Sequence, residues 1–140
     1  MNKGGSIEYK TNKELPAGQV LALYQSLGWS SAEKPELLLK ALRNSHSVVT
    51  AWDGDTLVGL GNAISDGYLV VYFPHLAVLP AYQGQGIGTE IVQRMQRQYR
   101  DFHQQTLVAD GQAIAFYEKL GFCTAGKCQA LWIYDGDDHG

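Results

Sequence analysis

Apolar residues in the first third of the chain follow a strand pattern and then two helical patterns. Residues 7–11 alternate between apolar and polar side chains, which predicts a short strand. Apolar residues at helical spacing predict a helix that begins at Pro16 and ends at Gly28. The same spacing predicts a second helix from Pro35 to about Asn44.

The middle of the chain changes to strand character. Two β-rich runs, residues 48–52 and 56–64, flank an Asp-Gly-Asp turn and predict a hairpin. A second Asp-Gly turn leads into a long β-branched and aromatic run, residues 68–78, which is interrupted by Pro74. Because proline donates no ladder hydrogen bond, we expect this strand to bulge or splay there.

Helices alternate with strands in the remainder of the chain. A glycine-rich loop at residues 83–88 leads into an amphipathic helix whose apolar stripe continues to Phe102. A short strand is expected at 106–109, a helix at 113–120 and a last strand at 130–134. The order β-αα-βββ-α-β-α-β predicts a mixed α/β, α+β-like fold whose sheet first meanders and then crosses over.

Composition narrows the classes of protein that this chain can belong to. With 140 residues, 45% hydrophobic and 18% charged, residues 1–140 are expected to form a single domain. A net charge of −3 argues against nucleic acid as a partner, and the apolar runs are too short for a membrane helix. Two cysteines, and no signal-like apolar run behind residues 1–6, favour a cytoplasmic protein. No His/Cys spacing indicates a metal site.

The glycine-rich loop is the strongest candidate for a functional site. Gly84, Gly86 and Gly88 stand at alternate positions between a strand and a helix. In such a loop, backbone N–H groups and the helix N-terminus can bind an anion, and glycine lets phosphate oxygens approach the amides. A dinucleotide-binding fingerprint would require a glycine at position 89, where this chain has Thr89. A P-loop would require a lysine, and the loop contains none. A glycine-rich connection with no ligand remains the alternative.

Two motifs resemble the signatures of the GNAT superfamily of N-acetyltransferases. The first, Gln83-Gly84-Gln85-Gly86-Ile87-Gly88, is similar to the family's Gln/Arg-x-x-Gly-x-Gly/Ala loop. The second, residues 113–122, is similar to its Ala-x-x-x-Tyr-x-x-x-Gly-Phe helix. Both motifs stand in the family's order, so the resemblance covers nearly the whole chain. It implies a GNAT fold: a central, mixed, mostly antiparallel, twisted sheet of six to seven strands, with a splayed fourth strand and about four flanking helices.

The resemblance also implies an activity and a cosubstrate. The expected reaction moves the acetyl group of acetyl-CoA to a primary amine by direct attack, with a small molecule as the first choice of acceptor and a peptide or protein amine as the second. A non-catalytic acyl-CoA-binding module is the alternative from another class. The residues expected to bind acetyl-CoA are Leu76, Ala77, Val78, Gln83, Gly84, Gln85, Gly86, Ile87, Gly88, Thr89, Asp110 and Phe116.

Two features depart from the family's pattern. Asp110 stands where the family usually has an asparagine that touches the pantetheine arm, so that contact would have a different polarity. The loop also lacks the basic residue that many relatives carry. Phosphate binding is therefore expected to rest on backbone amides and the helix dipole.

The expected catalytic residues are Tyr117 and His75. By its place in the second motif, Tyr117 would donate a hydrogen bond to the leaving thiolate, and a tyrosine packed on the sheet is the alternative. His75 would accept the ammonium proton, since an unperturbed histidine titrates near pH 6.5. The alternative is a half-buried strand histidine bonded to a neighbour.

Aromatic residues are candidates for the acceptor pocket, because aromatic faces suit cationic amines. In the family the first two helices and the fourth strand wall that pocket, although each ring is equally compatible with a place in the core. The residues that this wall would contribute are Tyr24, Trp29, Tyr68 and Tyr72. A homodimer is also expected, because family members often pair through late strands and Trp132 belongs to the predicted last strand.

Overall fold

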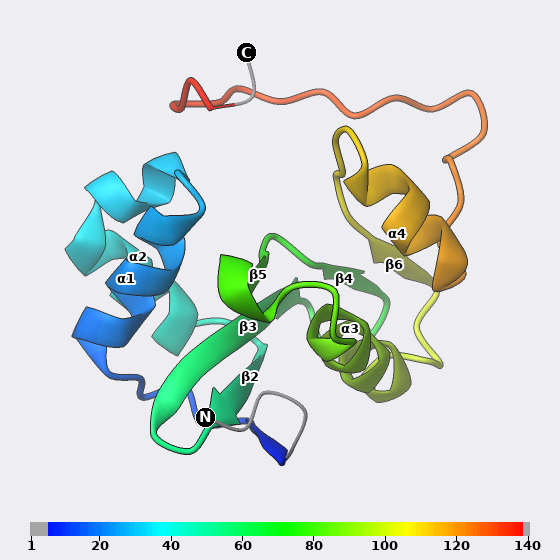
Figure 1. The fold of residues 1–140 in the computed structure, drawn as a ribbon. Coiled ribbons are helices and arrows are strands. Elements are labelled where there is room, and N and C mark those ends of the chain that lie inside the picture. Colours follow the sequence, from blue (N-terminus) through cyan, green and yellow to red (C-terminus); the bar gives the residue numbers. More distant parts are fainter. Residues whose placement is uncertain (1–5, 139–140) are drawn as a thin grey trace.

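The structure, a computed structural model, describes residues 6–138, and the six strands found there form one mixed sheet (Figure 1). Residues 1–5 lie outside the described residues, and they include most of the N-terminal segment in which no signal peptide is expected. Four strands follow the order β1-β2-β3-β4 antiparallel, β6 pairs parallel with β4, and β5 pairs only with β3. The strands are β1 (Ile7–Lys10), β2 (Ser47–Asp53), β3 (Thr56–Ser65), β4 (Val70–Tyr72), β5 (Leu76–Val78) and β6 (Gln104–Thr106). The predicted mixed, mostly antiparallel sheet is confirmed.

Helices cover both faces of the sheet. α1 and α2 lie against one face and α3 against the other (Figure 1). Proline stands at the N-cap of α1 and at the first position of α2, where a missing N–H costs nothing. The helices are α1 (Ala17–Ser26), α2 (Pro35–Arg43), α3 (Ile87–Gln98) and α4 (Ala113–Lys119), with short 3-10 turns η1 (Ser30–Glu33) and η2 (Pro80–Tyr82).

The close packing of α3 on β3 depends on a missing side chain. A Cβ atom placed on Gly61 would lie 2.7 Å from Ile91 Cγ2 and 2.8 Å from Met95 Cε. Both neighbours are buried in the core beneath α3. Glycine at this position therefore sets the distance between the helix and the sheet.

We expect Gly61→Ala to lower the free energy of unfolding by about 1–3 kcal/mol, because the added methyl group overpacks the core. Urea unfolding followed by circular dichroism measures the change. Gly18→Ala is the matched control, since Gly18 is an exposed residue of α1 with nothing within 4 Å of an added Cβ. Equal stability of the two variants would contradict the packing argument.

The predicted interruption at Pro74 divides one long run into two separate strands. β4 pairs with Ile64 and Ser65, near the end of β3, whereas β5 pairs with the Gly59–Gly61 segment. Between the two pairings, Asn62 Oδ1 accepts a 3.2 Å hydrogen bond from the backbone N–H of His75. β4 also pairs with β6, whereas β5 has no second neighbour in the described sheet. The run therefore parts from β6 beside His75, and the expected splay is confirmed.

Two predictions on the late strands are corrected. β6 lies at Gln104–Thr106 rather than at 106–109, because its parallel register with β4 runs from Val70↔Gln104 to Tyr72↔Thr106. Residues 130–134 form no strand, and they cross the open end of the molecule toward η1 without a ladder (Figure 1). Their apolar side chains divide between two environments, because Trp132 and Tyr134 line a cavity while Leu131 and Ile133 face solvent. Pairing of two copies through a last strand stays a prediction.

Two further expectations concern membrane-spanning helices and metal-binding clusters. Within residues 6–138, no helix has the length and apolar character needed to cross a membrane. Over the same part of the chain, no three His, Cys, Asp or Glu residues are grouped in a way that could hold a metal ion.

Candidate active site

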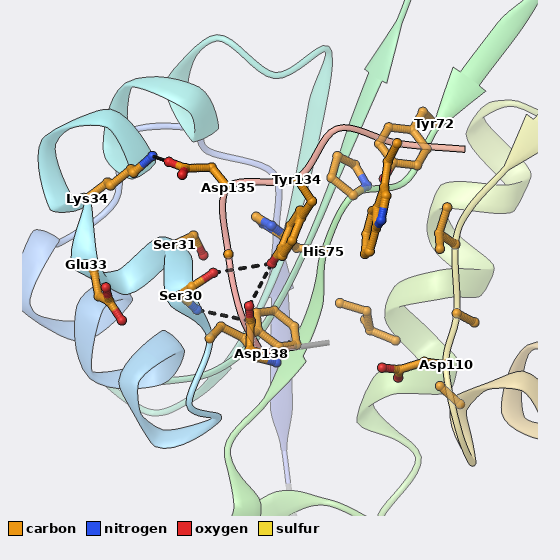
Figure 2. A pocket seen from close by; sticks show the side chains of 18 of the residues that line it. Ser30, Ser31, Glu33, Lys34, Tyr72, His75, Asp110, Tyr134, Asp135 and Asp138 are labelled. Carbon is orange, nitrogen blue, oxygen red and sulfur yellow. Dashed lines mark hydrogen bonds and ion pairs between the residues drawn. The ribbon is translucent and has the colours of Figure 1, made fainter. Parts of the chain in front are cut away.

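A cavity of about 640 Å³ opens where β4 and β5 separate (Figure 2). Four segments make its walls: the β4–β5 connection, the loop after β6 together with α4, the turn η1, and the end of the described chain. These segments contribute Tyr72, Pro74, His75 and Leu76; Val108, Ala109, Asp110, Ala113 and Tyr117; Trp29, Ser30, Ser31, Glu33 and Lys34; and Trp132, Tyr134, Asp135, Gly136 and Asp138.

Tyr117 of α4 presents a protonated phenol to this cavity. Its ring packs edge-on against Phe116 and Phe122, with centroid distances of 5.0 and 5.7 Å. Burial raises the pKa of Tyr117 to about 12. The hydroxyl therefore keeps its proton at neutral pH, and it can donate a hydrogen bond to a negative charge that develops nearby.

His75 belongs to an aromatic cluster with Tyr24 and Trp29 that forms part of the cavity wall. Its Nδ1 atom lies 2.9 Å from the hydroxyl of Tyr24, and its ring lies 5.5 Å from that of Trp29. Burial lowers the pKa of His75 to about 4, so the imidazole is neutral at pH 7. Burial also raises the pKa of Tyr24, and its phenol stays protonated. Tyr24 and His75 are therefore joined by a hydrogen bond between two uncharged groups.

The glycine-rich loop combines glycines in the left-handed backbone region with the N-terminus of α3. Gly84 and Gly86 have φ values of +79° and +87°, a region that favours glycine, and Gly86 is the N-cap of α3. The first amides of a helix have no intrahelical acceptor, so they are available to a ligand. Glu90, the acidic residue of the first turn, is paired with Arg94 at 2.8 Å. Its charge is thus partly offset beside the loop.

The two sequence motifs meet at Gly88. A Cβ atom on Gly88 would lie 3.5 Å from Phe116 Cζ of α4, and 3.6 and 3.8 Å from the side chains of Leu76 and Val78 of β5. The loop, the splayed strand and the helix that carries Tyr117 therefore converge at one place. A ligand bound at the loop has a short path along β5 to the cavity.

The comparisons with known proteins agree with this geometry. Residues 17–122 match the model of the acetyltransferase (GNAT) family. The chain belongs to the GNAT acetyltransferase family. The solved structure of a GNAT-family acetyltransferase from Streptococcus pneumoniae TIGR4 is 32% identical, with a TM-score of 0.82, and the match covers 94% of this chain and all of that one. The mixed sheet with its splayed strand is thus the GNAT fold.

This GNAT protein is also similar to a plant histone acetyltransferase and, in fold, to an aminoglycoside N-acetyltransferase. The histone acetyltransferase TAP1 of Glycine max is 29% identical over 84% of this chain. Matches to three curated relatives, TAP1 among them, span 53 to 61% of the length of those proteins, and 58% of TAP1. The aminoglycoside N-acetyltransferase AAC(6')-Iy, solved in complex with CoA, shares the fold at 12% identity, with a TM-score of 0.70 over 94% of this chain and 95% of its own.

The GNAT cavity brings together only some of the residues expected at the site. Those that line it are Trp29, Tyr72, His75, Leu76, Asp110 and Tyr117. Val78, Gly88 and Phe116 adjoin it through the junction described above. Gln83, Gly84, Gln85, Gly86 and Thr89 lie on the loop and on the first turn of α3. Ile87 and Ala77 point their side chains into the core, so they can offer a ligand only their backbone groups.

Two aromatic residues expected in the acceptor wall lie elsewhere. Tyr24 is fully buried, because its helical spacing turns the ring toward the sheet, and it contacts the site through His75 and Trp29. Tyr68 is 84% exposed on the turn after β3, where Asp66 Oδ1 accepts hydrogen bonds from the following amides. Neither belongs to the cavity lining.

The largest group that sequence reasoning missed is the end of the chain. Trp132, Tyr134 and Asp138 line the cavity, and none of them was predicted to do so. The η1 residues Ser30 and Glu33 were missed as well. The apolar run at residues 130–134 was the available signal, and it predicts a strand equally well.

Proposed function

We propose that this protein transfers the acetyl group of acetyl-CoA to the primary amine of a small molecule by direct attack, without an acyl-enzyme. The observation that carries the proposal is the convergence of the glycine-rich loop, β5 and Tyr117 on one cavity. Membership of the GNAT family supports it, as does the CoA bound to the fold relative AAC(6')-Iy.

The residues present fit acetyl-CoA. Amides of the loop and the N-terminus of α3 would hold the pyrophosphate, since the positive φ angles of Gly84 and Gly86 suit amides that turn toward one anion. β5 pairs on one edge only within the described sheet, so its other edge can bond the amides of the pantetheine arm. Asp110 lines the cavity near this path and would meet the arm with an acceptor group.

Direct attack requires a neutral amine. An alkylammonium of pKa about 10.4 costs about 4–5 kcal/mol to deprotonate at pH 7. In the proposed step the amine nitrogen attacks the thioester carbonyl, the C–N bond forms, and the C–S bond of the tetrahedral intermediate then breaks. Tyr117 donates a hydrogen bond to the departing thiolate, and the amine proton leaves toward His75 and solvent.

The pKa of His75 sets how it can act as the base. With a pKa of about 4, the imidazole is in its accepting form throughout the neutral range but holds a proton only briefly. It would therefore pass the proton on to water. Neither cysteine lines the cavity, and both are exposed, which favours direct attack over an acyl-thioester enzyme.

A small acceptor is favoured over a protein by the walls of the cavity. The end of the described chain crosses the side that faces η1, and it contributes five residues to the lining. A folded protein would have to displace this segment before a lysine could enter. Peptide amines remain the second choice.

Thiol release tests the proposal. Incubation of the protein with acetyl-CoA and a broad panel of amines should produce free CoA together with acetylated amine in equal amounts. Acetyl-CoA binding by calorimetry, without thiol release on any amine, would favour the non-catalytic acyl-CoA-binding module instead.

We expect Gly86→Ala to weaken acetyl-CoA binding about ten-fold, because an alanine at φ +87° carries about 1–2 kcal/mol of strain that the loop relieves by moving its amides. Calorimetric titration with acetyl-CoA measures the loss. Gly18→Ala is again the matched control, and an unchanged affinity in Gly86→Ala would remove the loop from the phosphate site.

A further inference from the structure

The last described segment of the chain, residues 127–138, forms a wall of the cavity that the family match does not reach. The match ends at residue 122. Beyond it, the chain crosses from α4 to η1 over the open end of the sheet (Figure 1). Trp132 and Tyr134 line the cavity, and their rings stack with a centroid distance of 4.4 Å and an interplanar angle of 12°. Part of the acceptor pocket therefore lies outside the segment that the family model describes.

Several polar contacts attach the segment to η1 (Figure 2). Asp138 Oδ2 accepts a 3.2 Å hydrogen bond from the backbone N–H of Ser30, and Asp138 Oδ1 accepts one of 2.9 Å from the hydroxyl of Tyr134. That hydroxyl also lies 3.3 Å from Ser30 Oγ. Lys34 forms an ion pair with Asp135. The wall is thus held at a defined position relative to Trp29 and His75.

Gly136 shows how closely the segment fits. A Cβ atom on this residue would lie 2.5 Å from Ser30 Oγ, 2.5 Å from Tyr134 Cε2 and 2.7 Å from Asp138 Oδ1. These are the same groups that join the segment to η1. Any side chain at position 136 would therefore disturb all three contacts.

The charges of the cavity lining are predominantly negative. Its acidic residues are Glu33, Asp110, Asp135 and Asp138, and its one lysine or arginine, Lys34, is paired with Asp135. The hydrogen bond from the Ser30 backbone lowers the pKa of Asp138 to about 2, so this carboxylate is ionised across the physiological range. His75 is neutral there and offsets none of this charge.

The negative lining does not serve the reacting nitrogen. That amine must lose its positive charge before it attacks, and nearby carboxylates would raise its pKa and oppose the loss. The same carboxylates, together with stacked aromatic rings, stabilise a cation that stays charged. The lining therefore suits an acceptor with two amino groups, one that reacts and one that remains an ammonium.

We propose that residues 127–138 select an acceptor that carries a second positive charge, such as a small diamine, through Asp138 and the Trp132–Tyr134 stack. This inference rests on the proposed acetyl transfer. The acceptor class is a small molecule with two amino groups, and residues 127–138 are the part of the chain that recognises it.

A matched series of amines tests the proposal in the full-length protein. 1,4-Diaminobutane, butylamine and 4-aminobutanoate place a cation, a methyl group and an anion about four to five bonds from a primary amine. The expected kcat/KM for thiol release is at least about ten-fold higher for the diamine than for butylamine, beyond the factor of about two from its two equivalent amines, and lowest for the anion. Added salt should reduce the difference.

Three variants locate the source of the selectivity. Asp138→Asn and Trp132→Leu should each bring the ratio of diamine to butylamine closer to one. Gly136→Ala should do the same by displacing the segment, whereas Gly18→Ala should keep the wild-type ratio. Melting temperatures measured in parallel identify any variant that has lost its fold.

Each outcome separates this inference from the function on which it rests. Thiol release without a preference for the diamine would overturn the inference and leave acetyl transfer standing. A preference that survives in all three variants would assign selection to another wall. Absence of thiol release with every amine would overturn the proposed function and the inference with it.

Discussion

Tyr117→Phe is expected to lower the rate of thiol release by about ten-fold or more while acetyl-CoA binding stays unchanged. The hydroxyl is the group that stabilises the departing thiolate, and its loss acts only in the transition state. The ring would keep its edge-on contacts with Phe116 and Phe122, so the fold of α4 should persist. Single-turnover kinetics measure the chemical step, and calorimetry measures the binding of acetyl-CoA.

Tyr9→Phe is the control for this experiment. It removes a phenol from β1, outside the cavity lining, and leaves the ring in place beneath the guanidinium of Arg94. It should therefore have no effect on turnover. An unchanged rate in Tyr117→Phe would remove Tyr117 from the mechanism.

The second large effect concerns stability at low pH. His75 has a folded-state pKa of about 4, against about 6.5 for an unperturbed histidine. As the pH falls through 6.5, the unfolded chain takes up a proton that the folded protein does not accept until about pH 4. The contribution to stability is therefore complete above pH 6.5 and is lost toward pH 4, by about 3 kcal/mol.

His75→Gln should remove this part of the pH dependence. Urea unfolding at pH 7 and pH 4 is expected to show a smaller loss of stability in the variant than in the wild type. His103→Gln, an exposed histidine after α3, is the control and should follow the wild type. Parallel pH curves for wild type and His75→Gln would show that His75 is not buried in its neutral form.

Much of the fold follows from short stretches of sequence. The helices at residues 17–26, 35–43, 87–98 and 113–119 carry their boundaries in nearby prolines, glycines and apolar stripes, and all four were predicted. Pro74 predicted the break in the third long strand, since the lost ladder bond is a property of one residue. The loop motif and the α4 motif were likewise readable, because each spans only a few consecutive positions.

Other features depended on contacts that no local pattern contains. Tyr24 and Trp29 are five positions apart and both aromatic, yet one is fully buried behind His75 and the other lines the cavity. The last predicted strand failed for a similar reason. Residues 130–134 are apolar throughout, and an extended apolar segment can line a cavity as well as it can join a sheet.

By itself, the sequence determined most of the elements, the glycine-rich loop and the family resemblance, because backbone preference and motif spacing act over a few neighbouring residues. Only the tertiary structure decided which side chains share the acceptor cavity. The contact between Ser30 and Asp138 joins residues 108 positions apart, and such a pairing follows from the packing of whole elements. The substrate selectivity proposed for this GNAT protein depends on that long-range contact.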